Sequence, residues 1–279
     1  VAQDPEKNHR QNYGTYFDPR FVRSDIVVEG AAAVAPMNVR KIIARRAAMC
    51  LTRECKVVNF GIGIPETVIA VLNEEGQDHL FTPIIESGAI GGIALGDMNF
   101  GSCICPDAII DQPYMFDFID GGGLDMSFLG LAQCDPKGNI NVSRFGTKVA
   151  GCGGFIDISQ NVKNMVFCGT FTAKGLKTHV EDGKLVIDQE GEDKKFKNTL
   201  QQITFSGTVA AQNNKNILFV TERAVLKLTR EGLVVTEIAP GIDLERDVLG
   251  QMEFRPSVAP DLKQMDQRIF LDCPMGLQF

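Results

Sequence analysis

Short apolar runs that end in glycine-rich turns alternate with amphipathic stretches in the first third of the chain. The stretch 38–52 carries apolar residues at helical spacing behind Asn38, which predicts an amphipathic helix with an N-cap. The apolar run 56–60 predicts a strand, and the stretch 66–75 behind the next turn predicts a helix. A second strand is predicted at 81–85, so the chain begins with successive α/β units.

The remainder of the chain is richer in turns and hairpin signals. Residues 103–154 predict mainly turns around one strand near 126–131. The pair Asp182-Gly183 stands between alternating residues and is a strong β-hairpin signal. Asp243 predicts the cap of a last helix that runs to about Met252. Further strands are predicted at 162–171, 216–221, 224–228 and 233–238.

This order of elements predicts an α/β fold: an open, mainly parallel sheet flanked by helices, with antiparallel additions. Residues 1–35 show little periodicity and predict a linker or an extended arm. Residues 36–279 then form the folded domain. The chain does not begin with methionine, which predicts a processed piece of a longer protein.

Composition narrows the class of partner. The 279 residues carry a formal net charge of −7, and this acidic balance argues against nucleic acid as the main partner. No apolar run reaches the length of a membrane span, and the first residues lack the order of a signal peptide. Eight scattered cysteines and three distant histidines predict reduced thiols in a cytoplasmic protein, surface histidines and no metal site.

Three glycine-rich turns, 61–65, 88–92 and 151–154, follow apolar runs. In open α/β sheets, ligands lie at the carboxyl ends of strands, where glycine leaves backbone N–H groups free to bind anions. Any one of these loops is also explained as a tight turn. Three loops that converge on one edge would indicate a ligand site. None matches the dinucleotide or Walker pattern.

Glu86 is the strongest candidate for a functional polar residue, because it follows the apolar strand 81–85 directly and precedes glycines. A carboxylate there is fixed by the strand and has little steric cover. The other interpretation is a glutamate that caps the following turn or forms a salt bridge, and the pattern alone favours it. The competing carboxylates are interpreted as turn residues; they are Asp117, Asp120, Asp125 and Asp135.

The string 86–92, Glu-Ser-Gly-Ala-Ile-Gly-Gly, resembles the catalytic glutamate motif of family I coenzyme A transferases. Further blocks in the same order resemble that family; they are 59–65, 116–125, 138–143, 169–173, 237–243 and 274–277. The resemblance extends from about residue 20 to the end, and the most similar branch is the acetate/propionate CoA-transferases. It implies a CoA-transferase fold of the NagB-like, Rossmann type.

The resemblance also implies roles for single residues. Glu86 would be the nucleophile, and the N–H of Gly153 or Gly154 would donate to the oxyanion. Gly169 and Lys177 would face coenzyme A. The pocket would be shaped by glycines and one isoleucine, namely Gly61, Ile62, Gly63, Gly88, Gly91 and Gly92.

The implied reaction moves coenzyme A between short-chain acyl-CoA thioesters and free acids, such as acetate, propionate, butyrate or lactate. It is a ping-pong reaction through a glutamyl-CoA thioester on Glu86, and it needs no metal. The implied partner is an amino-terminal half or alpha-type subunit, which would supply the second oxyanion donor. Residues 1–35 would connect to that half, 36–279 would be the catalytic domain, and complete units would form a homo-oligomer.

Two other functions fit the same architecture. A sugar-phosphate isomerase would use the glycine loops for phosphate and a carboxylate as base. A non-catalytic binding module would keep the loops and would not need an ionised Glu86.

Overall fold

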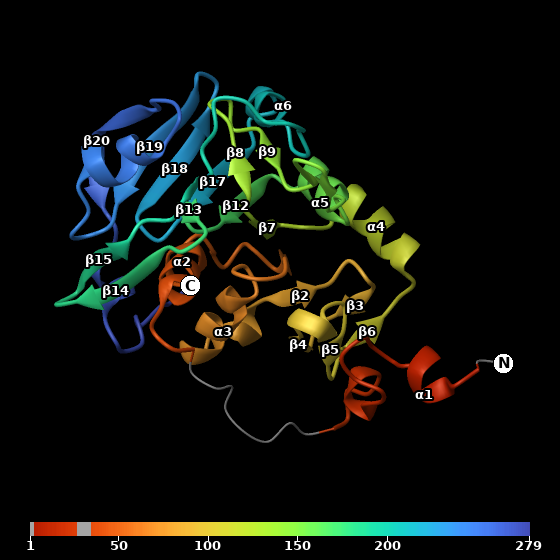
Figure 1. Ribbon diagram of the computed structural model, residues 1–279. Coiled ribbons are helices and arrows are strands. Elements are labelled where there is room, and N and C mark those ends of the chain that lie inside the picture. Colours follow the sequence, from red (N-terminus) through yellow and green to blue (C-terminus); the bar gives the residue numbers. More distant parts are fainter. Residues whose placement is uncertain (1–2, 27–34) are drawn as a thin grey trace.

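The computed structural model describes residues 3–26 and 35–279, and within them a ten-stranded sheet dominates the fold (Figure 1). The strand order is β20-β19-β18-β17-β12-β7-β1-β2-β3-β6. Its five central strands run parallel; they are β17 (Asn216–Val220), β12 (Asn164–Cys168), β7 (Met126–Gly130), β1 (Val57–Phe60) and β2 (Thr82–Ile84). The prediction of a mainly parallel sheet is therefore confirmed.

Antiparallel strands extend both edges of the parallel core. The outer strands are β18 (Ala224–Thr229), β19 (Gly232–Ile238), β20 (Ser257–Gln264), β3 (Ala89–Ile90) and β6 (Ala108–Ile109). β20 is an exception, because it runs parallel to β19. The predicted hairpin is confirmed as β14 (Lys177–Glu181) and β15 (Lys184–Gln189). Both of its turn residues, Asp182 and Gly183, have positive φ, as such a turn requires.

Further pairs of short antiparallel strands lie within the loops, outside the ten-stranded sheet. They are β4 (Ile93–Ala94) with β5 (Cys103–Ile104), β8 (Gln133–Cys134) with β9 (Ile140–Asn141), β10 (Arg144–Phe145) with β11 (Lys148–Val149), and β13 (Thr172–Ala173) with β16 (Asp193–Lys194).

The helices other than α1 cover both faces of the sheet, whereas α1 lies away from it near the N-terminus (Figure 1). They are α1 (Pro5–Asn8), α2 (Val39–Ala48), α3 (Thr67–Glu74), α4 (Gln112–Asp120), α5 (Phe155–Asn161) and α6 (Gly207–Gln212). The Asn38 side chain accepts two backbone N–H groups of α2, which confirms its predicted role as N-cap. α2 packs on α3 and on β12, whereas α5 packs on β7 and α6 on β18.

The strand order reverses between β1 and β7. From β1 the chain steps through α3 to β2, and from β7 it steps the other way through α5 to β12 and then to β17. Crossovers between parallel strands are as a rule right-handed, so two crossovers that run in opposite directions place α3 and α5 on opposite faces. A crevice opens at such a reversal, outside the carboxyl ends of the strands, and it is where open α/β sheets bind ligands.

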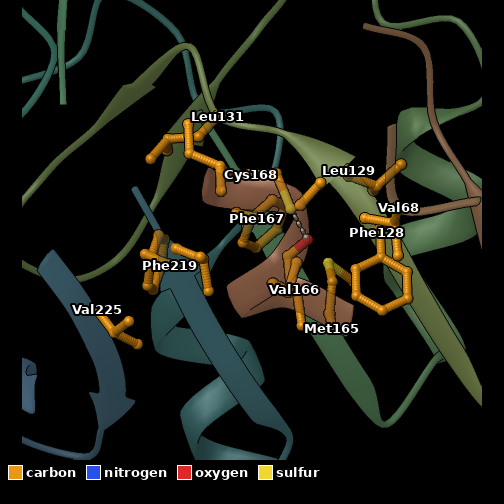
Figure 2. Close-up of a cluster of buried hydrophobic side chains, with 14 of the residues drawn as sticks. Val68, Phe128, Leu129, Leu131, Met165, Val166, Phe167, Cys168, Phe219 and Val225 are labelled. Carbon is orange, nitrogen blue, oxygen red and sulfur yellow. Dashed lines mark hydrogen bonds between the residues drawn. The ribbon is translucent and has the colours of Figure 1, made fainter. Parts of the chain in front are cut away.

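Phenylalanines fill the core beneath this edge. Figure 2 shows Phe167 beside Phe219 and Phe128 apart from them, on the face of the sheet that its partner Val166 shares, and none of the three phenylalanines is exposed to solvent. The rings of Phe167 and Phe219 lie 5.4 Å apart between centroids, in stacked orientation. Burial of each ring stabilises the sheet by about 2–3 kcal/mol, which makes the strand ends rigid supports for a site.

A buried arginine ties α2 to a distant segment. The guanidinium of Arg45 is fully buried and lies 3.2 Å from a carboxylate oxygen of Glu74 on α3. It also donates to the carbonyl oxygens of Leu271 at 2.5 Å and Cys273 at 2.8 Å. Residues at opposite ends of the sequence thus share one hydrogen-bonded cluster.

Two predictions for the middle and last segments are wrong. The region predicted as turns contains α4, so Asp117 and Asp120 lie on a helix. The predicted last helix is a π turn, Leu244–Val248, followed by a 3-10 turn, Leu249–Gln251. The predicted cap is confirmed, because the Asp243 side chain accepts the backbone N–H of residue 246. The Arg223 guanidinium donates a hydrogen bond to the carbonyl oxygen of residue 247. A continuing helix would use that oxygen as an acceptor.

The described part of the predicted arm contains regular structure and packs on the domain. Residues 1–2 and 27–34 lie outside the described residues. The rest contains α1 and a 3-10 turn that ends at Phe21, whose side chain is only 6% exposed. Backbone hydrogen bonds join Gly14 to Met98 and Arg20 to Cys105, so this segment packs on the loop region beside β5.

Candidate active site

A cavity of about 570 Å³ opens at the carboxyl edge of the sheet, at the reversal between β1 and β7. Loops that follow three parallel strands line it, namely 61–65 after β1, 129–132 at the end of β7 and 168–170 at the end of β12. Residues 151–155 and Glu86 also line it, together with Arg40, Phe100, Val142, Ile158 and Lys195. Two of the three predicted glycine loops therefore meet in one cavity.

Glu86 lies two residues beyond the end of β2, and its side chain is half-buried in the cavity wall. Burial raises the pKa of its carboxyl above the usual range, and two donors oppose that shift: its own backbone N–H and the side chain of Asn59. Among the described residues no cation forms an ion pair with this carboxylate. The alternative interpretation of Glu86 as one partner of a salt bridge is therefore not supported within them. The Glu86 carboxylate faces the cavity, and the two donors that act on it are uncharged.

Asn59 is a site residue that the sequence analysis did not single out. It is fully buried in β1, where its amide oxygen accepts the Ser127 hydroxyl at 3.2 Å and its amide nitrogen donates to the Ile84 carbonyl at 3.2 Å. These two bonds fix the amide beside Glu86. A lone asparagine in the apolar run Val57–Phe60 is the signal that could have revealed it.

The main chain at Gly154 touches Glu86. A Cβ at Gly154 would lie 3.1 Å from the Cγ of Glu86 and 3.3 Å from the Phe116 ring. In the part of the chain that the structure describes, the N–H groups of Gly153 and Gly154 donate no hydrogen bond. Gly153 has φ of +53°, a conformation that favours glycine. The turn thus brings main chain close to the candidate nucleophile, and its N–H groups have no acceptor among the described residues; such donors can stabilise an oxyanion.

The other predicted pocket residues do not all lie in this cavity. Gly61, Ile62, Gly63 and Gly169 line the same cavity as Glu86. Gly91 and Gly92 line a separate hollow of about 340 Å³ on the other side of β2.

Gly88 lies outside both hollows and packs against the carbonyl oxygen of Ile110, which a Cβ at Gly88 would approach to 1.9 Å. Lys177 stands exposed on the β14–β15 hairpin and is not part of the cavity wall.

Lys195 is the second site residue that the sequence did not reveal. Its side chain is only 9% exposed and reaches the cavity wall beside Gly169. Burial lowers the pKa of this amine to about 8, although the carboxylate of Glu222 opposes the shift. The run Lys194-Lys195-Phe196-Lys197 contains three lysines, and nothing in the pattern marks the buried one.

Other predicted features lie away from the cavity or on its border. All three histidines are exposed, as predicted, and the eight cysteines are free thiols, four of them buried. Asp135 accepts the backbone N–H of Lys137 in its own turn, as predicted, whereas Asp125 accepts the N–H groups of Lys56 and Val57 at the start of β1. Within residues 3–26 and 35–279 no cluster of histidine, cysteine or carboxylate side chains could hold a metal ion. No helix in these ranges is long and apolar enough to span a membrane.

Sequence comparison identifies the class of protein. The β subunit of an acetate CoA-transferase from Haemophilus influenzae is 30% identical over 241 residues, which cover 82% of this chain and 96% of that subunit. The chain belongs to the family I coenzyme A transferases, as its motif blocks indicated. A scan of protein-family models returns no match.

Two longer relatives are more similar. The acetate CoA-transferase YdiF of Escherichia coli O157:H7 is 44% identical over 277 residues, which cover 99% of this chain and 52% of that protein. A caffeate CoA-transferase of Acetobacterium woodii is 45% identical over 272 residues, with 96% and 52% covered. The chain thus spans about half the length of these two relatives.

The fold agrees with that assignment. A crystal structure of the YdiF acyl-CoA transferase, a thioester complex with CoA, matches with a TM-score of 0.87 and 42% identity over 99% of this chain and 51% of that one. The predicted CoA-transferase fold is confirmed.

Proposed function

We propose that this chain is the glutamate-bearing half of an acyl-CoA:carboxylate CoA-transferase and that Glu86 is its nucleophile. The observation that carries the proposal is the close approach of the Gly154 main chain to Glu86 at the reversal of the sheet, in a turn whose Gly153 and Gly154 N–H groups donate no hydrogen bond among the described residues. The relatives named above are acetate and caffeate CoA-transferases, and one of them forms a thioester complex with CoA.

In the first step a carboxylate oxygen of Glu86 attacks the thioester carbon of acyl-CoA. The tetrahedral oxyanion, held by N–H groups of the 153–154 turn, collapses as the carbon–sulfur bond breaks. The products are an acyl-glutamyl anhydride and CoA thiolate. Removing one oxyanion donor costs about 3–4 kcal/mol of transition-state stabilisation in comparable sites.

In the second step the thiolate attacks the glutamyl carbonyl and displaces the first carboxylic acid as its anion. A glutamyl-CoA thioester remains on Glu86. The second acid then repeats both steps in reverse order and leaves as its CoA thioester. Because the first acid departs before the second reacts, the kinetics are ping-pong.

Asn59 holds Glu86 in its reactive charge state. Attack requires the ionised carboxylate, whereas burial favours the protonated form. The amide of Asn59 donates to the carboxylate and opposes that effect. Activity therefore falls as the pH drops through the raised pKa of Glu86.

The reacting partners extend beyond this chain. We propose short-chain carboxylates of the acetate, propionate, butyrate or lactate type and their CoA thioesters as substrates, with no metal. An amino-terminal half or alpha-type subunit would close the cavity and supply a second oxyanion donor, because longer relatives are about twice this length while a β subunit matches nearly whole. We further propose a homo-oligomer of complete units in the cytoplasm.

A trapping experiment tests this proposal. The full-length enzyme is incubated with acetyl-CoA but no acceptor acid, reduced with borohydride and analysed by mass spectrometry. We expect reduction of Glu86 to an alcohol, and no such change in Glu86→Gln. Glu54→Gln, at an exposed position before β1, is the matched control and should trap normally. No change at Glu86 in an enzyme that turns over would overturn the mechanism, and proton exchange into a sugar phosphate would identify an isomerase.

A further inference from the structure

Lys195 is a buried cation without a hydrogen-bonded partner. Its side chain is 9% exposed, and among the described residues its amine forms no hydrogen bond or ion pair. The one carboxylate that acts on it, Glu222, is itself fully buried and already accepts the N–H of Phe171 and the guanidinium of Arg223. An ammonium in this position is destabilised until an acceptor arrives.

The amine and Glu86 belong to parts of the cavity wall that follow different strands. A Cβ at Gly169 would lie 2.8 Å from the Lys195 Nζ and 2.6 Å from the Leu131 carbonyl oxygen, so Nζ rests against the ends of β7 and β12. Glu86 follows β2, two strands from β7 and three from β12. At about 4.8 Å per strand, these ends are roughly 10–14 Å apart.

The occupant of the cavity must span that separation. The thioester carbon is bonded to Glu86 during the reaction, and a two- to four-carbon acyl group stays near it. The pantetheine arm of coenzyme A is long enough, because its second amide carbonyl is eight bonds from the sulfur. Isoleucine, leucine, valine and phenylalanine side chains line much of the wall, and its second cation, Arg40, is exposed. The buried surroundings of Lys195 therefore admit a neutral amide more readily than a diphosphate.

We propose that Lys195 binds the pantetheine arm of coenzyme A by donating a hydrogen bond from its ammonium group to the amide carbonyl farther from the sulfur. This inference rests on the proposed function. Lys195 then anchors the arm at β12 and so aligns the thioester with Glu86 at β2. It is a positioning residue, since it acts on the reacting carbon only through the arm.

The test compares three acetyl thioesters in the full-length enzyme with Lys195→Met. Acetyl-CoA and acetyl-pantetheine contain the farther amide, whereas acetyl-N-acetylcysteamine lacks it. We expect kcat/KM to fall about 10- to 100-fold with the first two substrates and less than about twofold with the third. The KM for the acceptor acid should not change. Lys227→Met, exposed on β18, is the control and should behave as wild type with all three.

Every other pattern overturns the proposal. A loss with acetyl-CoA alone would mean that Lys195 binds a phosphate. An equal loss with all three would mean that it acts at the thioester. No loss at all would leave Lys195 without a role in binding the arm, while trapping at Glu86 in wild type would still support the proposed function. Folding is checked by thermal melting, where removal of an unpaired buried ammonium should not lower the midpoint.

Discussion

Replacing Gly154 by alanine tests whether the main chain at this position forms part of the reaction centre. The added methyl carbon would lie 3.1 Å from the Cγ of Glu86 and 3.3 Å from the ring of Phe116. Both distances are shorter than ordinary van der Waals contact, so Glu86 or the 153–154 turn must shift by a few tenths of an ångström. The shift separates the carboxylate from the N–H donors beside it.

The two expected consequences differ greatly in size. Misplacement of reacting groups by a fraction of an ångström, with a disturbed oxyanion donor, should lower kcat about 10- to 100-fold, or about 1.4–2.7 kcal/mol. Folding should change little, because φ at Gly154 is −76° and suits alanine. A gain of about 0.4–1 kcal/mol from a stiffer unfolded chain offsets the crowding in the folded state.

The assay measures steady-state turnover, single-turnover formation of the Glu86 adduct, and the thermal midpoint. We expect slow adduct formation with a midpoint within about 4 °C of wild type. Gly250→Ala is a matched control, because its methyl carbon would crowd the Glu245 carbonyl oxygen at 3.0 Å away from the cavity wall. Wild-type adduct formation in Gly154→Ala would refute the placement of this main chain at the reaction centre.

Two further predictions concern buried polar groups. Asn59→Ala removes a donor that lowers the pKa of Glu86, so that pKa should rise further, and the acid limb of kcat/KM should move to higher pH; a pH–rate profile that stays in place would contradict the role of Asn59. The same variant leaves the Ser127 hydroxyl without its acceptor and should lose about 1–3 kcal/mol of stability in denaturant titration. Arg223→Met leaves the fully buried carboxylate of Glu222 without its cation and should cost about 3–5 kcal/mol, whereas a loss below about 1 kcal/mol would show that water or rearrangement compensates.

Local pattern was sufficient for the elements that place Glu86. The cap at Asn38, the strands β1 and β2 and the Asp182-Gly183 hairpin each follow from residues close in sequence, and each is present. α4 also carried such signals, because a proline opens it and Gly121 follows it. The glycines around it masked those signals.

Other features depend on contacts that no local pattern contains. β20 is largely exposed and carries a proline, and it becomes a strand only by pairing with β19. Lys195 is buried because the ends of β7 and β12 enclose it, although its neighbours Lys194 and Lys197 are more accessible. The divergence of the glycine loops is likewise tertiary: none of residues 88–92 lines the cavity, and Gly91 and Gly92 line the separate hollow instead.

The cluster around Arg45 has a consequence for the order in which the protein folds during synthesis. Arg45 and Leu271 are separated by 226 residues, yet the guanidinium is fully buried only when the carbonyls of residues 271 and 273 reach it. Until then α2 would have to bury a charge with few acceptors, so the sheet it covers stays open to solvent and to chaperones. Nearly the whole domain must therefore leave the ribosome before α2 packs in its final position. Fragments that stop before residue 271 should not fold independently.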